Sequence, residues 1–113
     1  MNTPWGKSQG RADKLAPGIN FYSTAGHGGY KVSKTTLALM PPALRNEDGW
    51  YEEDMEWCKI AIAFPHLFTP AIVSIARELH YFYYNPDGTY TSEEHRDKAR
   101  KEKTFSKPPD PQL

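Results

Sequence analysis

The chain has 113 residues, of which 38% are hydrophobic and 25% are charged, and this composition indicates one globular domain that folds without a disulfide or a structural metal. Its 14 Lys and Arg balance its 14 Asp and Glu, so the net charge gives no support for a nucleic-acid-binding or membrane-binding class. Cys58 has no second cysteine to pair with, no apolar run is as long as a membrane span, and the N-terminus lacks a signal-peptide pattern. We therefore expect a cytoplasmic protein with no membrane partner.

The N-terminal half is predicted to contain the sheet. Residues 1–16 are polar and interrupted by glycine, so we expect an irregular segment held to the core by Trp5 and Leu15. Apolar and polar side chains alternate in residues 19–24 and again in 30–33, which predicts a β-hairpin with a five-residue connection. Residues 37–40 could form a third short strand that Pro41 ends, because proline lacks the backbone donor that a ladder needs.

Two helices are predicted in the middle of the chain. The first runs from about residue 50 to residue 64, with Asp48 or Gly49 as its cap, an apolar face at helical spacing and Pro65 as its end. The second follows Thr69, a good N-cap, and begins at Pro70, which suits the first helical position. Its apolar stripe continues to about residue 83.

The C-terminal part is more highly charged. Thr91 and Glu94 form a capping-box pattern before a segment with almost no apolar face, which predicts a solvated helix, and the last residues have the composition of a disordered tail. We therefore expect an α+β fold. Residues 1–91 would form a single domain, a small antiparallel sheet packed with two main helices, and residues 92–113 a charged helix and tail.

A histidine lies among glycines in the predicted hairpin loop, in the stretch Gly26-His27-Gly28-Gly29. Glycines can adopt positive φ and expose successive N–H groups, which would let the loop hold an anion. An imidazole in such a loop would be accessible and usable as an acid, a base or a metal ligand. The alternative is a turn that needs glycine for its geometry and tolerates the histidine.

Four acids crowd the start of the first predicted helix: Glu52, Glu53, Asp54 and Glu56. With His27 they could form an acid/base or hard-metal site, in which the catalytic residues would be His27, Glu52, Glu53 and Asp54. Acids near a helix start are also favoured by the helix dipole alone, and they could pair with Lys7, Arg11 or Lys14. The residue pattern leaves both interpretations open, and whether a metal is bound is unknown at this point.

The run from His80 to Tyr84 carries more aromatic side chains than one helix face can bury. We expect Tyr81 and Tyr84 at the edge of the apolar stripe or outside it, with Arg77 one turn away. Exposed tyrosine beside arginine is typical of an interface hot spot. Together with the acids Glu52 and Glu56, these residues form the predicted binding surface; the alternative is that the sheet or the tail covers the tyrosines.

Three stretches resemble an uncharacterised domain family found on phages, plasmids and related mobile elements: TPWGKSQG, APGINFYSTAGHGGYKVS and DGWYEEDMEWCKIAIAFPHLFTP. The resemblance covers the first three-quarters of the chain and implies a mobile-element accessory protein, without an activity or catalytic residues. Its motifs, TPWG, FxSTxGHGG and GWYEED, correspond here to Thr3, Pro4, Trp5, Gly6, Ser23, Thr24, Gly26, His27, Gly28, Gly29, Trp50, Tyr51, Glu52, Glu53 and Asp54. The resemblance favours a meeting of the glycine loop and the acidic turn.

We expect a non-catalytic binding protein without a cofactor, whose partner is a host protein or a defence complex, in the manner of an anti-CRISPR inhibitor. Surplus aromatic side chains, segregated charge and the lack of a complete catalytic set favour this class. One alternative is a hydrolase or transferase, metal-assisted or not, built from His27 and the carboxylates. Another is a nucleic-acid-binding module that uses the basic N-terminal segment and the C-terminal tail.

Overall fold

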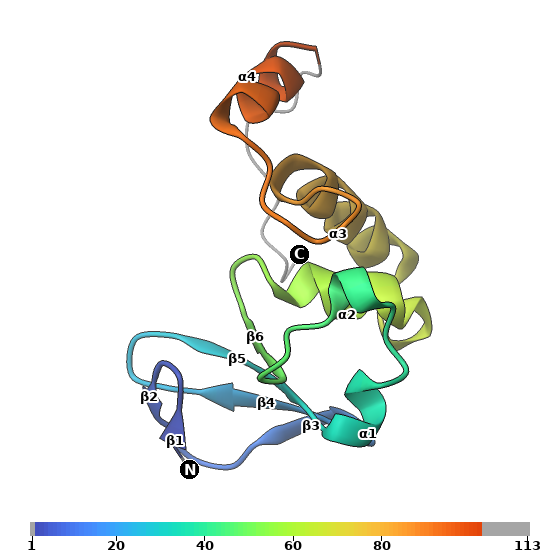
Figure 1. Cartoon of the computed structure of the whole chain (residues 1–113). Coiled ribbons are helices and arrows are strands. Elements are labelled where there is room, and N and C mark those ends of the chain that lie inside the picture. The colour runs from blue at the N-terminus through green and yellow to red at the C-terminus, as the bar shows by residue number, and fades with distance from the viewer. Residues whose placement is uncertain (1, 103–113) are drawn as a thin grey trace.

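The computed structural model describes residues 2–102 and has an α+β fold with antiparallel sheets, as the sequence predicts (Figure 1). A two-stranded hairpin is formed by β1 (Asn2–Thr3) and β2 (Gly6–Lys7). The main sheet has the order β3 (Asp13–Ala16), β4 (Ile19–Ser23), β5 (Gly28–Val32) and β6 (Trp50–Glu52). The helical segments are α1 (Lys34–Leu37), η1 (Pro42–Leu44), α2 (Trp57–Ala63), η2 (Pro65–Leu67), α3 (Pro70–Tyr83) and α4 (Glu93–Glu102).

The predicted hairpin is present as β4 and β5, with a connection one residue shorter than expected. Its strands pair as far as Ser23 and Gly28, so residues 24–27 form the connection. Thr24 closes this loop, because its backbone N–H and its hydroxyl both donate to the carbonyl of His27, at 2.7 Å and 2.5 Å. The His27 N–H donates back to Thr24 Oγ1 at 3.1 Å. The loop therefore presents the imidazole from a closed turn.

Residues 37–40 are not the strand that the sequence suggests, but the end of α1 and the turn after it. Ser33 caps this helix by accepting from the Thr36 N–H at 3.3 Å. Leu37 and Met40 are both buried in the core. Their spacing of three residues places both side chains on the same side of this helical turn and its continuation, toward the core.

The first predicted helix begins later than expected, at Trp57 rather than Trp50. Trp50–Glu52 instead pairs with β5 as the edge strand β6, and Tyr51 lies opposite Tyr30. Tyr51 is fully buried, and its hydroxyl donates to the Leu44 carbonyl at 2.7 Å. Strand alternation then turns Trp50 and Glu52 to the other face. The prediction of Asp48 or Gly49 as a helix cap is wrong, because the segment they precede is a strand.

The N-terminal segment is more regular than the sequence suggests. It contains the β1–β2 hairpin and the edge strand β3, which pairs with β4. Trp5, at the turn of the small hairpin, contacts the Trp50 ring edge-on, with the ring centroids 5.5 Å apart. Leu15 packs against the main core. Both predicted anchors therefore attach this segment to the rest of the fold.

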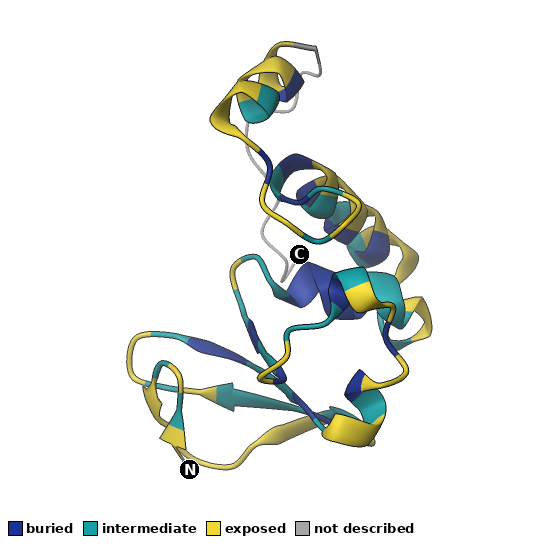
Figure 2. Ribbon diagram, viewed as in Figure 1, coloured by how far each residue is buried: buried dark blue, intermediate teal, exposed yellow. Residues whose placement is uncertain are grey.

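Helix α2 lies between the sheet and α3, and the core has a part on each side of it (Figure 2). Ile60 packs with the sheet residues Ile19, Val32 and Tyr51. The other part is formed with α3 and contains Trp57, Cys58, Ala61, Ala76 and Leu79. The apolar face predicted for this helix is confirmed from Trp57 onward. Helix α3 has the predicted start, since Thr69 Oγ1 accepts from the Ile72 N–H at 3.3 Å and Pro70 is its first residue.

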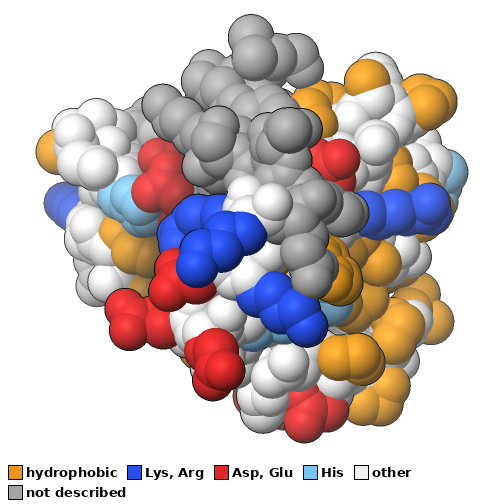
Figure 3. Space-filling view, turned by 90° about the horizontal axis from the view of Figure 1, so that it is seen from above, with side chains coloured by type: hydrophobic (Ala, Val, Ile, Leu, Met, Phe, Trp, Pro, Cys, Tyr) orange, Lys and Arg blue, Asp and Glu red, His pale blue; other side chains and the backbone are white. Residues whose placement is uncertain are grey.

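The C-terminal helix α4 is capped differently from the prediction. Ser92 Oγ accepts from the His95 N–H at 3.1 Å, whereas Thr91 is buried and donates to the Phe82 carbonyl at 2.6 Å. Ala99 is buried, and the Arg100 guanidinium lies over the Phe82 ring at 5.0 Å, so α4 packs on α3 through few side chains. Acidic and basic side chains intermingle on the face seen from above (Figure 3). The predicted disordered tail falls on residues 103–113, outside the described residues.

Within residues 2–102, no helix has both the length and the apolar character needed to cross a bilayer.

Gly28 and Gly29, which follow His27, serve close packing rather than unusual backbone angles. Gly26, Gly28 and Gly29 are not among the glycines with positive φ, so the backbone geometry expected for an anion-holding loop is absent at these three residues. A Cβ on Gly29 would collide with the Trp5 indole and would lie 2.5 Å from the Tyr51 carbonyl oxygen. Gly29 therefore lets the Trp5 ring lie directly on the strand.

We predict that Gly29→Ala destabilises the protein by about 1–3 kcal/mol, because the added methyl group overpacks this contact. Gly26→Ala is the matched control, since a Cβ there meets nothing within 4 Å, and its effect should stay within about 1 kcal/mol. Urea denaturation followed by tryptophan fluorescence measures both. Equal stability of the two variants would contradict the packing role of Gly29.

Candidate functional site

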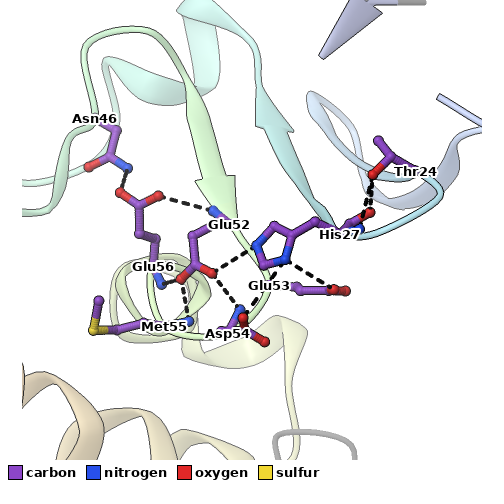
Figure 4. Close-up of polar contacts among 8 residues, drawn as sticks. All are labelled: Thr24, His27, Asn46, Glu52, Glu53, Asp54, Met55 and Glu56. Atoms are coloured by element: carbon purple, nitrogen blue, oxygen red, sulfur yellow. Dashed lines mark hydrogen bonds and ion pairs between the residues drawn. The ribbon is translucent and has the colours of Figure 1, made fainter. Parts of the chain in front are cut away.

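The imidazole of His27 and the acids that follow β6 lie together at one edge of the sheet (Figure 4). His27 Nε2 is 3.2 Å from Glu52 Oε2. His27 Nδ1 is 3.8 Å from Asp54 Oδ2 and 3.9 Å from Glu53 Oε1. We call these four residues the His27 cluster. The predicted meeting of hairpin loop and acidic turn is present in the fold, whereas its chemical role stays a prediction.

Strand pairing between β5 and β6 creates this meeting. Gly29 lies opposite Glu52, so the residues that precede Gly29 face those that follow Glu52. The Glu53 N–H donates to the Gly28 carbonyl at 3.0 Å and continues the pairing past the end of the strand. The backbone therefore brings the hairpin loop next to the acidic turn, and no long-range ion pair is required to do so.

Glu52 organises the acidic turn through its carboxylate. Oε1 accepts from the Glu56 N–H at 2.7 Å and also from the Met55 N–H, and Oε2 accepts from the Asp54 N–H at 2.9 Å. The side chain is only 17% exposed. None of these acids lies in the first turn of α2, because residues 53–56 form a turn that Glu52 closes. A carboxylate that accepts several N–H groups is held in one orientation.

Glu56 lies in a polar network behind this turn rather than on an open binding surface. Its carboxylate accepts from Asn46 Nδ2 at 2.7 Å and from the Glu52 N–H at 3.2 Å. Asn46 Oδ1 in turn accepts from Lys59 Nζ at 2.9 Å. Lys59 is buried, and this burial lowers its pKa against the opposing effect of the Glu56 carboxylate. Glu56 therefore connects the Asn46 side chain to the backbone of β6, a structural role that its position in the sequence does not indicate.

The outer side of the His27 cluster is open to solvent. The side chains of His27 and Asp54 are 29% and 77% exposed. The Trp5 ring meets the imidazole edge-on, with the centroids 5.8 Å apart. Exposed carboxylates beside a half-buried imidazole that an aromatic ring supports can exchange protons with water or bind a cation.

The hydrogen bond to Glu52 decides which imidazole nitrogen is available. When Nε2 carries a proton and donates it to Glu52, the neutral imidazole has its lone pair on Nδ1. That nitrogen faces Asp54 and Glu53. One donor atom each from His27, Glu52 and Asp54 also lie within 4.8 Å of one another. The His27 cluster could therefore hold a metal ion, with Glu52 either as a ligand or as the carboxylate that orients the imidazole.

Tyr84 is buried, contrary to the prediction of an outward tyrosine, and only 3% of it is exposed. The chain turns back after α3, Tyr84 forms a β-bridge with Tyr90, and the two rings stack 5.2 Å apart. Its ring also stacks on His80, and Lys59 Nζ lies 4.4 Å from its centre. Burial raises the pKa of the Tyr84 hydroxyl and lowers that of His80.

Tyr81 is 53% exposed, as predicted, and contacts the His95 ring of α4. Arg77, one turn earlier on α3, is exposed as well. Tyr81 and Tyr84 therefore do not form one exposed surface. Lys7, Arg11 and Lys14 are exposed, and within residues 2–102 no ion pair joins them to the acidic turn.

Cys58 is not available as a nucleophile. It is fully buried, and burial raises the pKa of its thiol to about 12. The side chain is therefore a neutral thiol at physiological pH, enclosed between α2 and α3. Chemistry at this protein's surface must come from other residues.

Trp5, Asn46 and Trp50 contribute to the site in ways that the sequence does not indicate. Together with Pro4, Glu47, Asp48 and Glu56 they line a cavity of about 460 Å³. The sequence suggests only an anchor at Trp5 and a helix residue at Trp50. The pairing of β6 with β5 turns the Trp50 side chain outward, where it forms one wall of the cavity. The sequence alone does not indicate this pairing.

Residues 1–107 match the family described as a domain of unknown function, DUF7007. The chain belongs to this family. Comparisons with curated proteins and with solved structures give no match. The resemblance to an uncharacterised domain family is thereby confirmed, and the three stretches that carry it in this DUF7007 domain meet at the His27 cluster.

We predict that Glu52→Gln destabilises the domain by about 1.5–3 kcal/mol, because an amide cannot accept from all the N–H groups that the carboxylate now holds. Glu53→Gln, which leaves those hydrogen bonds intact, should cost less than about 0.5 kcal/mol. Chemical denaturation of both variants gives the two values. If Glu53→Gln proved as costly as Glu52→Gln, the organising role of Glu52 would be refuted.

Proposed function

We propose that this DUF7007 domain binds a divalent metal ion at His27 and uses a water bound to that ion for hydrolysis. The observation that carries the proposal is the hydrogen bond between His27 Nε2 and Glu52, which turns Nδ1 toward Asp54 and Glu53. Metal-binding histidines commonly donate their second ring N–H to a carboxylate, which sets the tautomer and the ring orientation. Glu52 is suited to that role because the backbone N–H groups of the turn already hold it.

The donor spacing supports the proposal. Two ligands of a tetrahedral zinc site, each about 2.0–2.1 Å from the metal, lie roughly 3.4 Å apart. The separations from His27 Nδ1 to Asp54 and Glu53 are 3.8 Å and 3.9 Å. Exposed side chains can close a difference of about 0.5 Å by small torsional changes. One nitrogen and two carboxylate oxygens suit zinc or manganese.

The exposure of the cluster supports a reaction with water. Coordination positions not taken by His27, Asp54 and Glu53 would face solvent, since Asp54 is largely exposed. A metal ion lowers the pKa of its bound water toward about 7 and so produces hydroxide at neutral pH. Trp5 covers one edge of the imidazole and limits the approach from that direction. Hydrolysis is the reaction class that this arrangement favours.

We predict that the protein binds Zn²⁺ or Mn²⁺ and that His27→Gln and Asp54→Asn abolish this binding. Glu52→Gln should weaken it by about 10-fold through loss of the orienting hydrogen bond. Isothermal titration calorimetry on EDTA-treated protein measures the affinities. His66→Gln is the control, because His66 is an exposed histidine outside the His27 cluster. Equal metal affinity of His27→Gln and the wild type would remove the proposal.

The hydrolytic part has its own test. Metal-loaded protein should cleave bis(p-nitrophenyl) phosphate or p-nitrophenyl acetate, with release of p-nitrophenol followed by absorbance. The His27→Gln variant should lack this activity. Metal binding without such cleavage would retain the metal site and reject hydrolysis.

We also propose, as a second candidate, that the protein acts by binding a host protein as an accessory factor of a phage or plasmid. The motif resemblance supports that origin, and the exposed Tyr81 and Tyr90 support a protein contact, with exposures of 53% and 62%. Tyrosine and arginine are enriched at protein interfaces, and Arg77 lies one turn from Tyr81. Tyr84 does not belong to this surface.

For this second candidate, we predict that the Arg77→Ala/Tyr81→Ala variant loses a host protein that the wild type and Glu78→Gln both retain. Glu78 lies on the same helix and is exposed, so it controls for general changes of α3. Affinity purification from host extract with quantitative mass spectrometry provides the measurement, and thermal unfolding checks that α4 stays attached. Retention of the same proteins by all three forms would exclude this surface.

A further inference from the structure

The Trp5 indole that contacts His27 also lines the cavity of about 460 Å³ described above. Its aromatic walls are Trp5 and Trp50, whose ring planes make an angle of 86°. Asn46 and Glu56 contribute polar groups, and Glu47 and Asp48 contribute carboxylates that are exposed. The cavity therefore combines two indoles with three acids.

Both indoles are held in place by the fold. Trp5 rests where Gly29 lacks a Cβ, and its backbone N–H donates to Thr3 Oγ1 at 3.2 Å within the small hairpin. Trp50 is held by strand pairing and by an edge contact with Tyr22, with centroids 5.6 Å apart. A ligand that enters would meet walls that are already formed, so little ordering of the protein opposes binding.

The charge at the cavity is negative. Among residues 2–102, no salt bridge is formed by Glu47, Asp48 or Glu56, although the Glu56 carboxylate interacts electrostatically with the nearby Lys59. The two lysines at its border donate to uncharged oxygens instead: Lys31 Nζ to the Asp48 carbonyl at 2.7 Å, and Lys59 Nζ to Asn46 Oδ1 at 2.9 Å. The exposed carboxylates of Glu47 and Asp48 therefore keep acceptor capacity for a cation from outside, whereas both Glu56 oxygens already accept from the protein.

The molecule already places a cation on one of these rings. Lys31 Nζ lies 4.9 Å from the centre of the Trp50 ring. Tryptophan is the side chain that attracts cations most strongly through its π face. The Trp50 ring is therefore accessible to a cation at cation–π distance in the folded protein.

We propose that this cavity binds a guanidinium group, either of a small molecule or of an arginine side chain in a partner protein. A guanidinium is planar, stacks on aromatic rings, is weakly hydrated and donates in a fork to carboxylates. The perpendicular indoles offer a ring to stack on, and the exposed Glu47 and Asp48 offer acceptors. This inference goes beyond the proposed metal site and does not depend on it, because none of the cavity residues belongs to the His27 cluster.

The test titrates EDTA-treated protein with N-acetyl-arginine methylamide, agmatine and a tri-arginine peptide. The readout is the indole N–H signals in NMR spectra, assigned with single Trp→Phe variants. We expect the Trp5 and Trp50 signals to shift, and the Trp57 signal to stay, because Trp57 is buried in the α2–α3 core. N-acetyl-citrulline methylamide, which has a urea in place of the guanidinium, should cause no shift. Binding should weaken as salt is added.

The Glu47→Gln/Asp48→Asn variant should bind the arginine compound about 5-fold more weakly, as expected for the loss of two exposed carboxylates. The amide oxygen that Asp48→Asn introduces can still accept from the Trp50 backbone N–H, as Asp48 Oδ1 does at 2.9 Å. Glu78→Gln/Glu93→Gln removes the same charge from α3 and α4 and should bind as the wild type does. Tighter binding of the peptide than of the single compounds would identify a protein partner as the source, and the reverse order a small molecule.

Equal shifts with the citrulline and arginine compounds, or no shift with any guanidinium compound, would overturn the proposal. Equal loss of binding in both double variants would overturn it too, because the effect would then come from net charge alone. Each of these outcomes is independent of metal binding, since the protein contains no added metal in this experiment.

Discussion

The region around His27 depends on the hydrogen bonds that the Glu52 carboxylate accepts. This carboxylate closes the turn between β6 and α2 by accepting from backbone N–H groups, and it holds the imidazole of His27 from the neighbouring hairpin. Without this acceptor the N–H groups of the turn would lose their partners at a half-buried position, which is costly. The same side chain thus fixes where α2 starts and how His27 is oriented.

Three segments that are far apart in the sequence are joined at this point. Trp5 lies on Gly29, where a side chain would leave no room for the indole, and its ring touches His27 and Trp50. The same three segments carry the motifs noted in the sequence. Their shared location would let one set of residues serve both folding and the proposed chemistry, because a rigid packing of aromatic rings and backbone is what positions a reactive side chain.

The His27 cluster and the cavity lined by Trp5 and Trp50 have no residue in common, but they are in contact. Trp5 contacts the imidazole and lines the cavity, and Glu56 lines the cavity and accepts from the Glu52 N–H. A ligand stacked on Trp5 would therefore lie near a metal bound at His27. The proposed metal and guanidinium sites could act on one ligand, and they remain separable by experiment because different side chains carry them.

The sequence by itself determined the elements whose signals are local. The alternation of residues 19–24 predicts the hairpin, and Thr69 and Pro70 predict the start of α3, because cap chemistry and side-chain period depend only on neighbours in the chain. It also identified His27 and the acids as residues that could meet, although their distances depended on strand pairing.

The tertiary structure decided the features that depend on a partner. Trp50–Glu52 is too short a segment to show a period of its own, and it became a strand because the edge of β5 was available to pair with it. The helical spacing places Tyr84 at the edge of the apolar stripe of α3, where it would be exposed. The chain after α3 folds back, however, and Tyr90 covers it. Gly29 is needed because of the ring of Trp5, which is distant along the chain. These contacts join segments whose sequences carry no sign of each other, and only the folded chain brings them together.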